Sequence, residues 1–293
     1  QPLSREVFWH IYAKIPRHTS QNAITEGDFK CILARNCEGT EQLHRIKEII
    51  EKGFDLMYKI MTPGPTQVAE NVRLARSREC TNPDLDENFV EFYKETCKEI
   101  SRLLHTDNET LILGGEGILG LEAACASMTE PGDRVLVLDN GIYGKGFADF
   151  VSMYGGCPEL YSRDYRETLD VQELENFLKE NHDYKYATVV HGDTPSGMLN
   201  DVSAICPLLK KYGIMTVVDS VSASFGEPMR ISDWQIDIMC GGSQKVVSAP
   251  PGLTFVVISN DAKKAMTDRK TPIASFYANL TTFAHYYEEK WFP

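Results

Sequence analysis

Several features that mark other classes of protein are missing from this chain of 293 residues. Charged residues interrupt every apolar stretch before it reaches the roughly 18 residues that a membrane-spanning helix needs. The eight cysteines form no CxxC pair, and no HxxxH sequence would place two imidazoles on one helical face. The sequence therefore predicts a soluble globular protein with neither a membrane span nor a metal site.

Positive charge is also scarce. Lys and Arg number 30 against 42 Asp and Glu, which gives a formal net charge of −12. Nucleic acid and anionic membranes both attract basic surfaces, so neither is expected as a partner. A small anionic ligand remains compatible, because it needs only a local site. The scattered cysteines are typical of free thiols in a reducing compartment, and we expect the protein to be cytoplasmic.

The middle of the chain alternates between short apolar runs, with the length of buried strands, and segments with helical spacing. The expected strands are 111–113, 134–138, 186–191, 214–219, 236–240 and 254–259, and the expected helices are 120–128, 144–154, 171–180 and 202–212. This alternation predicts an α/β fold in which a mainly parallel, doubly wound sheet lies between helices. Ligands of such sheets bind beyond the carboxyl ends of the strands.

Two charged residues lie where such a ligand would bind. Asp219 ends the stretch 214–219, and Lys245 is the only charged residue between Ile238 and Asn260. An amine in apolar surroundings is partly desolvated, which favours its neutral, nucleophilic form. Pyridoxal phosphate (PLP) enzymes need both groups, because a lysine forms an imine with the cofactor aldehyde and a carboxylate keeps the pyridine nitrogen protonated. The alternative is structural, with an aspartate that caps a turn and a lysine that reaches water.

A glycine-rich segment follows the first expected strand. Leu111-Ile-Leu-Gly-Gly115-Glu-Gly117-Ile-Leu-Gly120 has the pattern of a strand, a turn and a helix start, whose backbone N–H groups can bind a phosphate. The glycines can equally serve a tight turn for steric reasons. The segment also matches GxGxxG, and Asp139 ends the next strand near the spacing of a ribose-binding acid. A dinucleotide site is therefore a second interpretation, although it leaves Asp219 and Lys245 without a role.

Several short segments keep an order that one enzyme family shares. They are Thr62-Pro-Gly-Pro-Thr66, Gly115-Glu-Gly117 with Leu121-Glu-Ala-Ala124, Glu130-Pro-Gly-Asp133, Asn140-Gly-Ile-Tyr-Gly144, His191-Gly-Asp-Thr-Pro-Ser-Gly197, Val218-Asp-Ser-Val221, and Gly242-Ser-Gln-Lys245 with Ala249-Pro-Pro-Gly252. Together they resemble the class V aminotransferases of PLP fold type I, especially the alanine–glyoxylate and serine–pyruvate branch. The similarity runs from about residue 56 to the end of the sequence and is more specific than any single motif.

The resemblance implies roles for the matching positions. Lys245 corresponds to the lysine that carries PLP as a Schiff base, and Asp219 to the partner of the pyridine nitrogen. The other implied cofactor contacts are Tyr143 and Val221 on the two faces of the ring, Thr194 near its phenolic oxygen, Gln244, Gly115, Glu116, Gly117 and Ile118 around the phosphate, and Tyr277 from a neighbouring subunit. Gly64 is expected to contact the substrate. The resemblance also implies a homodimer with shared active sites, and it gives His191 no catalytic role.

Three features differ from the family pattern. Glu116 occupies a phosphate-binding position where relatives usually have Ser or Thr; a carboxylate repels a phosphate, so only backbone N–H groups are expected to contribute there. Tyr143 replaces a larger aromatic side chain, often Trp. The sequence also stops at Pro293, where relatives continue into a small domain that supplies the arginine for the substrate carboxylate. Neither Arg230 nor Arg269 matches that motif.

We therefore expect three parts in the chain. Residues 1–55, with a helical pattern at 40–53, form an N-terminal extension of unknown role. Residues 56–270 form the PLP-binding large domain. Residues 271–293 are the start of a truncated C-terminal segment, so the usual C-terminal small domain is expected to be absent.

The functional prediction is a PLP-dependent aminotransferase that moves an amino group between a small amino acid, such as alanine or serine, and a small 2-oxo acid. Lys245 and Asp219 are its predicted catalytic residues. A PLP enzyme of another reaction type, a lyase or a C–C bond-forming enzyme, would use the same pair and stays an alternative. A catalytically impaired scaffold subunit with a PLP fold is a further one.

Overall fold

The computed structural model of the chain describes residues 59–79 and 82–292. The fold below is that of the second of two units of the chain, which begins at Ile60. The helix predicted at 40–53 and the boundary predicted after residue 55 lie outside the described residues.

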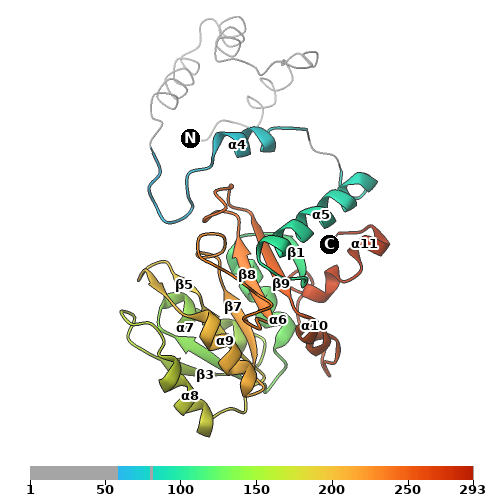
Figure 1. The fold of residues 1–293 in the computed structure, drawn as a ribbon. Helices are drawn as coiled ribbons and strands as arrows, with labels where there is room; N and C mark the ends of the chain where they lie inside the picture. Colours follow the sequence, from blue (N-terminus) through green and yellow to red (C-terminus); the bar gives the residue numbers. More distant parts are fainter. Residues whose placement is uncertain (1–58, 80–81, 293) are drawn as a thin grey trace, which may run out of the picture. The chain divides into compact units, whose positions relative to one another are not determined.

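A seven-stranded sheet forms the centre of the second unit (Figure 1). Its strands are β1 (Glu109–Gly114), β2 (Arg134–Asp139), β3 (Cys157–Ser162), β4 (Tyr186–Val190), β7 (Met215–Asp219), β8 (Ile238–Gly242) and β9 (Leu253–Ile258), in the order β1-β9-β8-β7-β4-β2-β3. Only β9 pairs antiparallel with its neighbours, β1 and β8. The mainly parallel sheet between helices is confirmed.

Helices cover both faces of this sheet. The helices of this unit are α4 (Glu70–Arg76), α5 (Glu87–Leu103), α6 (Gly117–Met128), α7 (Ile142–Met153), α8 (Val171–Glu180), α9 (Val202–Lys211), α10 (Asn260–Thr267) and α11 (Tyr286–Glu289), with a 3₁₀ turn η1 (Leu280–Phe283). Helices α6 and α7 pack on one face, and α9, with α8 beside it, packs on the other.

Alternate side chains of each strand enter two separate hydrophobic cores, as the period of a strand requires. In β2, Val135 and Val137 join the core under α6 and α7, whereas Leu136 and Leu138 join the core under α8 and α9. All four are at most 1 % exposed. The strands are apolar on both faces because both faces are covered. Because β2, β3, β4, β7 and β8 run parallel, their carboxyl ends lie at the same edge of the sheet.

Several elements differ from the sequence-based expectation, which also did not include helices α4, α10 and α11. β3 was not expected, because its sequence CPELYS contains a proline and its residues are mostly exposed or half-buried at the sheet edge. A two-stranded hairpin of β5 (Gly192–Asp193) and β6 (Met198–Leu199) follows β4, and the expected strand 186–191 ends at Val190 instead. Helix α5 was also missed, although the Asp86 side chain accepts a hydrogen bond from Asn88 N at its start.

Within the described ranges, every helix is too short or too polar to cross a bilayer. The five cysteines found there, Cys97, Cys125, Cys157, Cys206 and Cys240, are all unpaired thiols.

Candidate active site

A cavity lies at the carboxyl ends of the parallel strands, where ligands of α/β sheets bind. Its lining comes from the segments that follow β1, β2, β4, β7 and β8. It is lined by Glu116, Gly117, Ile118, Leu121, Tyr143, Gly192, Asp219, Val221, Ser222, Gln244 and Lys245. The structure thus brings together eight of the predicted site residues, which come from four separate stretches of the sequence.

Asp219 is the last residue of β7 and is only 6 % exposed. One of its carboxylate oxygens accepts a hydrogen bond from Val221 N at 2.9 Å. Burial raises the pKa of this carboxyl to about 6, against the lowering effects of the Val221 N–H and of Lys245. A buried carboxyl with a raised pKa favours a cationic partner, because such a partner stabilises its ionised form.

Lys245 follows β8, the neighbour of β7, and is half-buried. Its Nζ donates to Thr194 Oγ1 over 3.3 Å, and that hydroxyl also exchanges a hydrogen bond with Ser222 Oγ at 2.5 Å. Gly64 lies directly against the lysine: a Cβ there would come within 2.3 Å of Cδ and 2.8 Å of Nζ. The lysine side chain is therefore held between the Thr194 hydroxyl and a segment that only glycine permits.

The segment around Gly64 is fixed to the loop after β8, which contains Lys245, by hydrogen bonds from Thr66. Thr66 N donates to Gln244 O at 2.9 Å, and its hydroxyl donates to Lys245 O at 2.9 Å. The structure therefore places the Thr62-Pro-Gly-Pro-Thr66 segment beside the predicted catalytic lysine.

The glycine-rich turn after β1 brings the start of α6 close to its neighbours. A Cβ at Gly117 would lie 2.6 Å from Val221 Cγ2, and a Cβ at Gly120 would lie 2.5 Å from Thr254 Oγ1. These glycines let α6 approach Val221 and β9 closely. Gly117 and Ile118, in the first turn of α6, line the cavity, and the backbone N–H groups of a first helical turn favour a negative group.

Glu116 is the residue immediately before α6, and its side chain makes no capping hydrogen bond. It is exposed, as is Ile118 at 53 %, and both line the cavity. Tyr143, in the first turn of α7, is 43 % exposed and lines the cavity as well. A half-exposed tyrosine at a cavity wall is available to stack on a flat ligand.

Three residues that the resemblance places around the cofactor phosphate have other contacts in the structure. Gly115 does not line the cavity; a Cβ there would meet Leu119 Cδ2 at 2.4 Å, so this glycine permits the turn. Gln244 is buried, and its Oε1 has no hydrogen-bond partner within the described residues. The hydroxyl of Tyr277 accepts a hydrogen bond from Gly114 N of the same chain at 2.8 Å, just before the glycine-rich turn.

The sheet order contradicts the dinucleotide interpretation. In a dinucleotide fold the strand that carries the ribose-binding acid lies beside the strand before the glycine-rich turn. Here β9, β8, β7 and β4 separate β1 from β2. Asp139, at the end of β2, is 4 % exposed and accepts a hydrogen bond from Ser162 Oγ at 2.8 Å. It is therefore a buried residue far along the sheet from Gly115.

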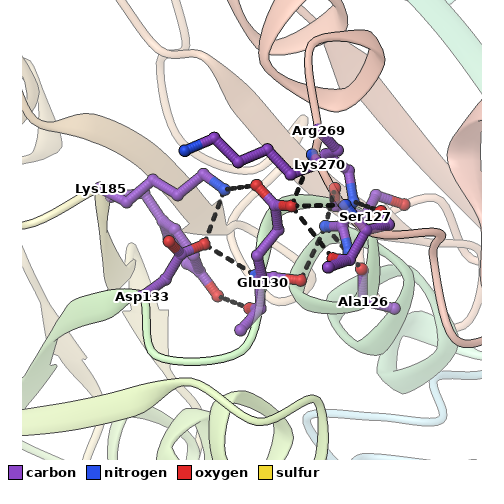
Figure 2. Close-up of polar contacts among 10 residues, drawn as sticks. Ala126, Ser127, Glu130, Asp133, Lys185, Arg269 and Lys270 are labelled. Atoms are coloured by element: carbon purple, nitrogen blue, oxygen red, sulfur yellow. Dashed lines mark hydrogen bonds and ion pairs between the residues drawn. The ribbon is translucent and has the colours of Figure 1, made fainter.

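Both arginines noted in the sequence are engaged elsewhere. Arg269 donates through Nη1 to the carbonyls of Ser127 and Thr129, at 2.9 and 2.7 Å, and so covers the carboxyl end of α6 (Figure 2). Arg230 pairs with Asp233 on the surface. His191, 4 % exposed, shares a hydrogen bond with Ser220 Oγ, and burial lowers its pKa to about 4. Its burial agrees with a structural position.

Sequence reasoning missed four residues of the site, of which Leu121 and Gly192 line the cavity without a polar side-chain group. Ser222 lines the cavity and contacts Thr194, and it directly follows the Val218-Asp-Ser-Val221 motif. Thr66 holds the loop after β8, and it ends the Thr62-Pro-Gly-Pro-Thr66 motif. Ser222 and Thr66 lie beside or within motifs that resemble the family pattern. Their hydroxyl groups in those positions could have marked them as site residues.

Comparison with known proteins identifies the family. The model of a family described as class V aminotransferases matches residues 63–288. The chain belongs to this family. It is 35% identical over 216 residues to a pyridoxamine–pyruvate transaminase of Mesorhizobium japonicum, covering 73% of this chain and 54% of that protein. It is 29% identical over 267 residues to an alanine–glyoxylate aminotransferase of Rattus norvegicus, covering 90% and 64%.

A solved structure supports the same fold. An alanine–glyoxylate aminotransferase from Nostoc sp. superposes with a TM-score of 0.76 at 24% identity, over 80% of this chain and 62% of that one. The fold is therefore that of PLP fold type I enzymes. The chain spans 54% and 64% of the length of the two curated relatives above.

The residues at the cavity fit the ring of this family's cofactor. Asp219 offers a buried carboxyl for a protonated ring nitrogen, and Lys245 offers a primary amine to an aldehyde. Val221 and Tyr143 provide an apolar and an aromatic surface for a flat ring. The fit is less favourable at the phosphate position, where the side chain beside the helix start is that of Glu116.

Proposed function

We propose that this chain carries the catalytic centre of an aminotransferase that uses vitamin B6 chemistry to move an amino group between a small amino acid and a small 2-oxo acid. The observation that supports it is the convergence of Lys245 and Asp219, from neighbouring strand ends, on one cavity. Relatives named as transaminases of glyoxylate or pyruvate support the substrate class.

The residues of the chain then have separate roles. When bound, the cofactor supplies an electron sink for the bond that breaks at the substrate Cα. Lys245 would hold the cofactor when no amine substrate is bound, and its free Nζ would otherwise move a proton at the substrate Cα. Asp219 keeps the ring nitrogen protonated by its negative charge. Thr194, which accepts from Nζ over 3.3 Å, orients the amine, and Val221 and Tyr143 fix the plane of the ring.

The same pair of residues would serve a lyase or a C–C bond-forming enzyme, so the reaction type needs its own test. Transfer of the amino group predicts that an added 2-oxo acid, pyruvate or glyoxylate, is converted to the matching amino acid. A change of absorbance with amino acids but no amination of either oxo acid would favour the lyase alternative.

The primary experiment is to titrate the full chain with saturating PLP, to follow its visible absorbance, and to map the adduct after borohydride reduction. We expect a yellow band that borohydride removes and an adduct on Lys245. Lys245→Ala should abolish both the band and transamination. Lys145→Ala, at an exposed lysine of α7 outside the cavity lining, is the matched control and should keep both. Unchanged turnover in Lys245→Ala would refute the proposal.

Two further proposals follow from the family. We propose that the protein is a homodimer with shared active sites, in which Tyr277 serves the cofactor of the neighbouring subunit, and that it works in the cytoplasm. Mixed dimers of Lys245→Ala and Tyr277→Phe chains test the sharing: each variant alone should be impaired, and mixing should restore part of the activity. A chain that sediments as a monomer at full activity would contradict it.

A further inference from the structure

Glu116 occupies the position that the resemblance to the family assigns to the phosphate group of the cofactor. It directly precedes α6 and lines the cavity beside Gly117 and Ile118. The first turn of a helix attracts a negative group through its N–H groups and its dipole. In this chain a carboxylate of the protein itself is already there, exposed and without a capping hydrogen bond. The position that a phosphate would fill is therefore next to a negative side chain.

The remaining cavity offers little positive charge to offset this carboxylate. Among the described residues that line it, Lys245 is the single cation, and its amine is assigned to the aldehyde. Asp219 adds a second acid. Arg269 and Arg230, the arginines noted in the sequence, are engaged at the far end of α6 and with Asp233. The cavity as a whole is therefore poor in the cations that usually accompany a bound phosphate.

The two forms of a B6 compound would respond to Glu116 in opposite ways. A phosphate monoester carries a charge of about −1.5 to −2 at pH 7, so it is repelled by a neighbouring carboxylate. Without the phosphate, the same position of the ring bears a neutral hydroxymethyl group. Its O–H can donate a hydrogen bond to the carboxylate, and hydrogen bonds to ionised acceptors are the stronger kind. The Glu116 side chain thus disfavours the phosphate ester of the B6 compound and favours the form with a free hydroxymethyl group.

We propose that this site takes unphosphorylated pyridoxal and pyridoxamine in preference to their phosphate esters, and that Glu116 is the residue that sets this preference. The inference rests on the proposed function, since it needs the B6 ring between Asp219 and Lys245. It assigns Glu116 a role in selecting the ligand. It also implies that the bound B6 compound exchanges with solution, because the phosphate anchor is not used.

The test compares dissociation constants of pyridoxal and of PLP for the full chain, measured by absorbance titration and equilibrium dialysis at low and high salt. The wild type should bind pyridoxal more tightly than PLP. Glu116→Ser and Glu116→Gln should tighten PLP binding by about 10- to 100-fold and weaken pyridoxal binding. The PLP penalty of the wild type should shrink at high salt, because salt screens the repulsion. Asp149→Asn, an exposed acid of α7 outside the cavity lining, should change neither constant.

The outcomes separate the two proposals. If the wild type binds PLP at least as tightly as pyridoxal, and Glu116→Gln leaves that ratio unchanged, the selectivity inference is wrong while the aminotransferase proposal stands. If neither compound forms an adduct with Lys245 in any variant, the proposed function fails and the inference falls with it. A reversed preference in Glu116→Ser, with an adduct on Lys245 in both chains, would support both.

Discussion

Asp219 and Glu130 are two carboxyls at opposite ends of the same sheet, in opposite electrostatic surroundings. Glu130, before β2, accepts hydrogen bonds from the Lys185 ammonium at 3.2 Å and from the backbone N–H groups of Lys270 and Thr271 at 2.8 and 2.9 Å (Figure 2). Its burial acts to raise the pKa, but these donors outweigh it and hold the pKa at about 2. Asp219 has a single backbone donor, and burial raises its pKa to about 6.

The difference distinguishes a structural cluster from a binding site. At the amino ends of β2 and β4, Lys185 also pairs with Asp133 at 2.6 Å, so the charges of that cluster are matched within the protein. At the carboxyl ends, Asp219 is buried with too few donors for its charge. A buried carboxyl with few hydrogen-bond donors marks a candidate ligand site, because a ligand can supply the donor that the protein lacks there.

The largest expected effect comes from filling the space beside the cavity lysine. Gly64→Ala would place a Cβ 2.3 Å from Lys245 Cδ, so the amine must move from Thr194. Displacements of about 1 Å can lower rates by about 100-fold, and we expect a loss of that order in turnover. Gly64 also has a φ of 156°, which side chains rarely adopt, so the free energy of unfolding should fall by about 1–3 kcal/mol as well. Gly146→Ala, whose Cβ would meet nothing within 4 Å, is the control. Full activity in Gly64→Ala would show that the segment is not held against the lysine.

The two carboxyls should give opposite pH dependence of stability. Because the pKa of Asp219 is raised by folding, its favourable contribution is present below about pH 4 and is lost as the pH rises through about 6. Asp219→Asn should remove this fall in the free energy of unfolding with rising pH, which is worth about 2–3 kcal/mol at about 1.4 kcal/mol per pKa unit. The measurement is urea unfolding of the wild type and this variant between pH 4 and 7. Parallel curves would contradict the prediction.

Glu130 provides the matched opposite case. Its pKa is lowered by folding, so its contribution is present above about pH 4.5 and is lost as the pH falls toward 2. Glu130→Gln should therefore be less stable than the wild type at pH 7, and the two should converge in acid. A variant that stays equally destabilised at pH 2 would assign the effect to packing.

The smallest effect is expected at the far end of α6. Arg269→Met leaves the carbonyls of Ser127 and Thr129 without their donor, which should destabilise the protein by about 1–3 kcal/mol. Binding of B6 compounds should not change, since Arg269 is absent from the cavity lining. Thermal unfolding together with an absorbance titration measures both. Arg102→Met, at an exposed pair with Glu99, should lose less than about 1 kcal/mol.

Much of the sheet could be predicted because its central strands are apolar throughout. The expected run 134–138 lies within β2, and 171–180 coincides with α8. Strand direction could not be predicted, because side-chain periodicity is the same for β9 whether it runs parallel or antiparallel. The edge strand β3 carries no apolar run to mark it. The order of the strands in the sheet depends on which strands pair with each other, and the local sequence pattern does not contain that information.

The site was predictable where one residue type is required by chemistry. Lys245 and Asp219 could be proposed because an isolated amine and a strand-terminal acid are unusual in apolar surroundings. The ion pair of Lys185 with Asp133 could not be, because it joins residues 52 apart whose proximity depends on the register of β2 and β4. Gly64 was marked only by its motif, and its contact with Lys245 needed coordinates.

The hydrogen bond between Thr66 and Lys245 has a consequence for how the chain folds. It joins residues 179 positions apart, so it closes most of the described chain into one loop. Contacts of such large sequence separation form slowly, because the intervening chain must lose its freedom first. During refolding, the sheet should therefore acquire its protection from hydrogen exchange before the amide of Thr66 does. A competent site would then appear as the last event of folding.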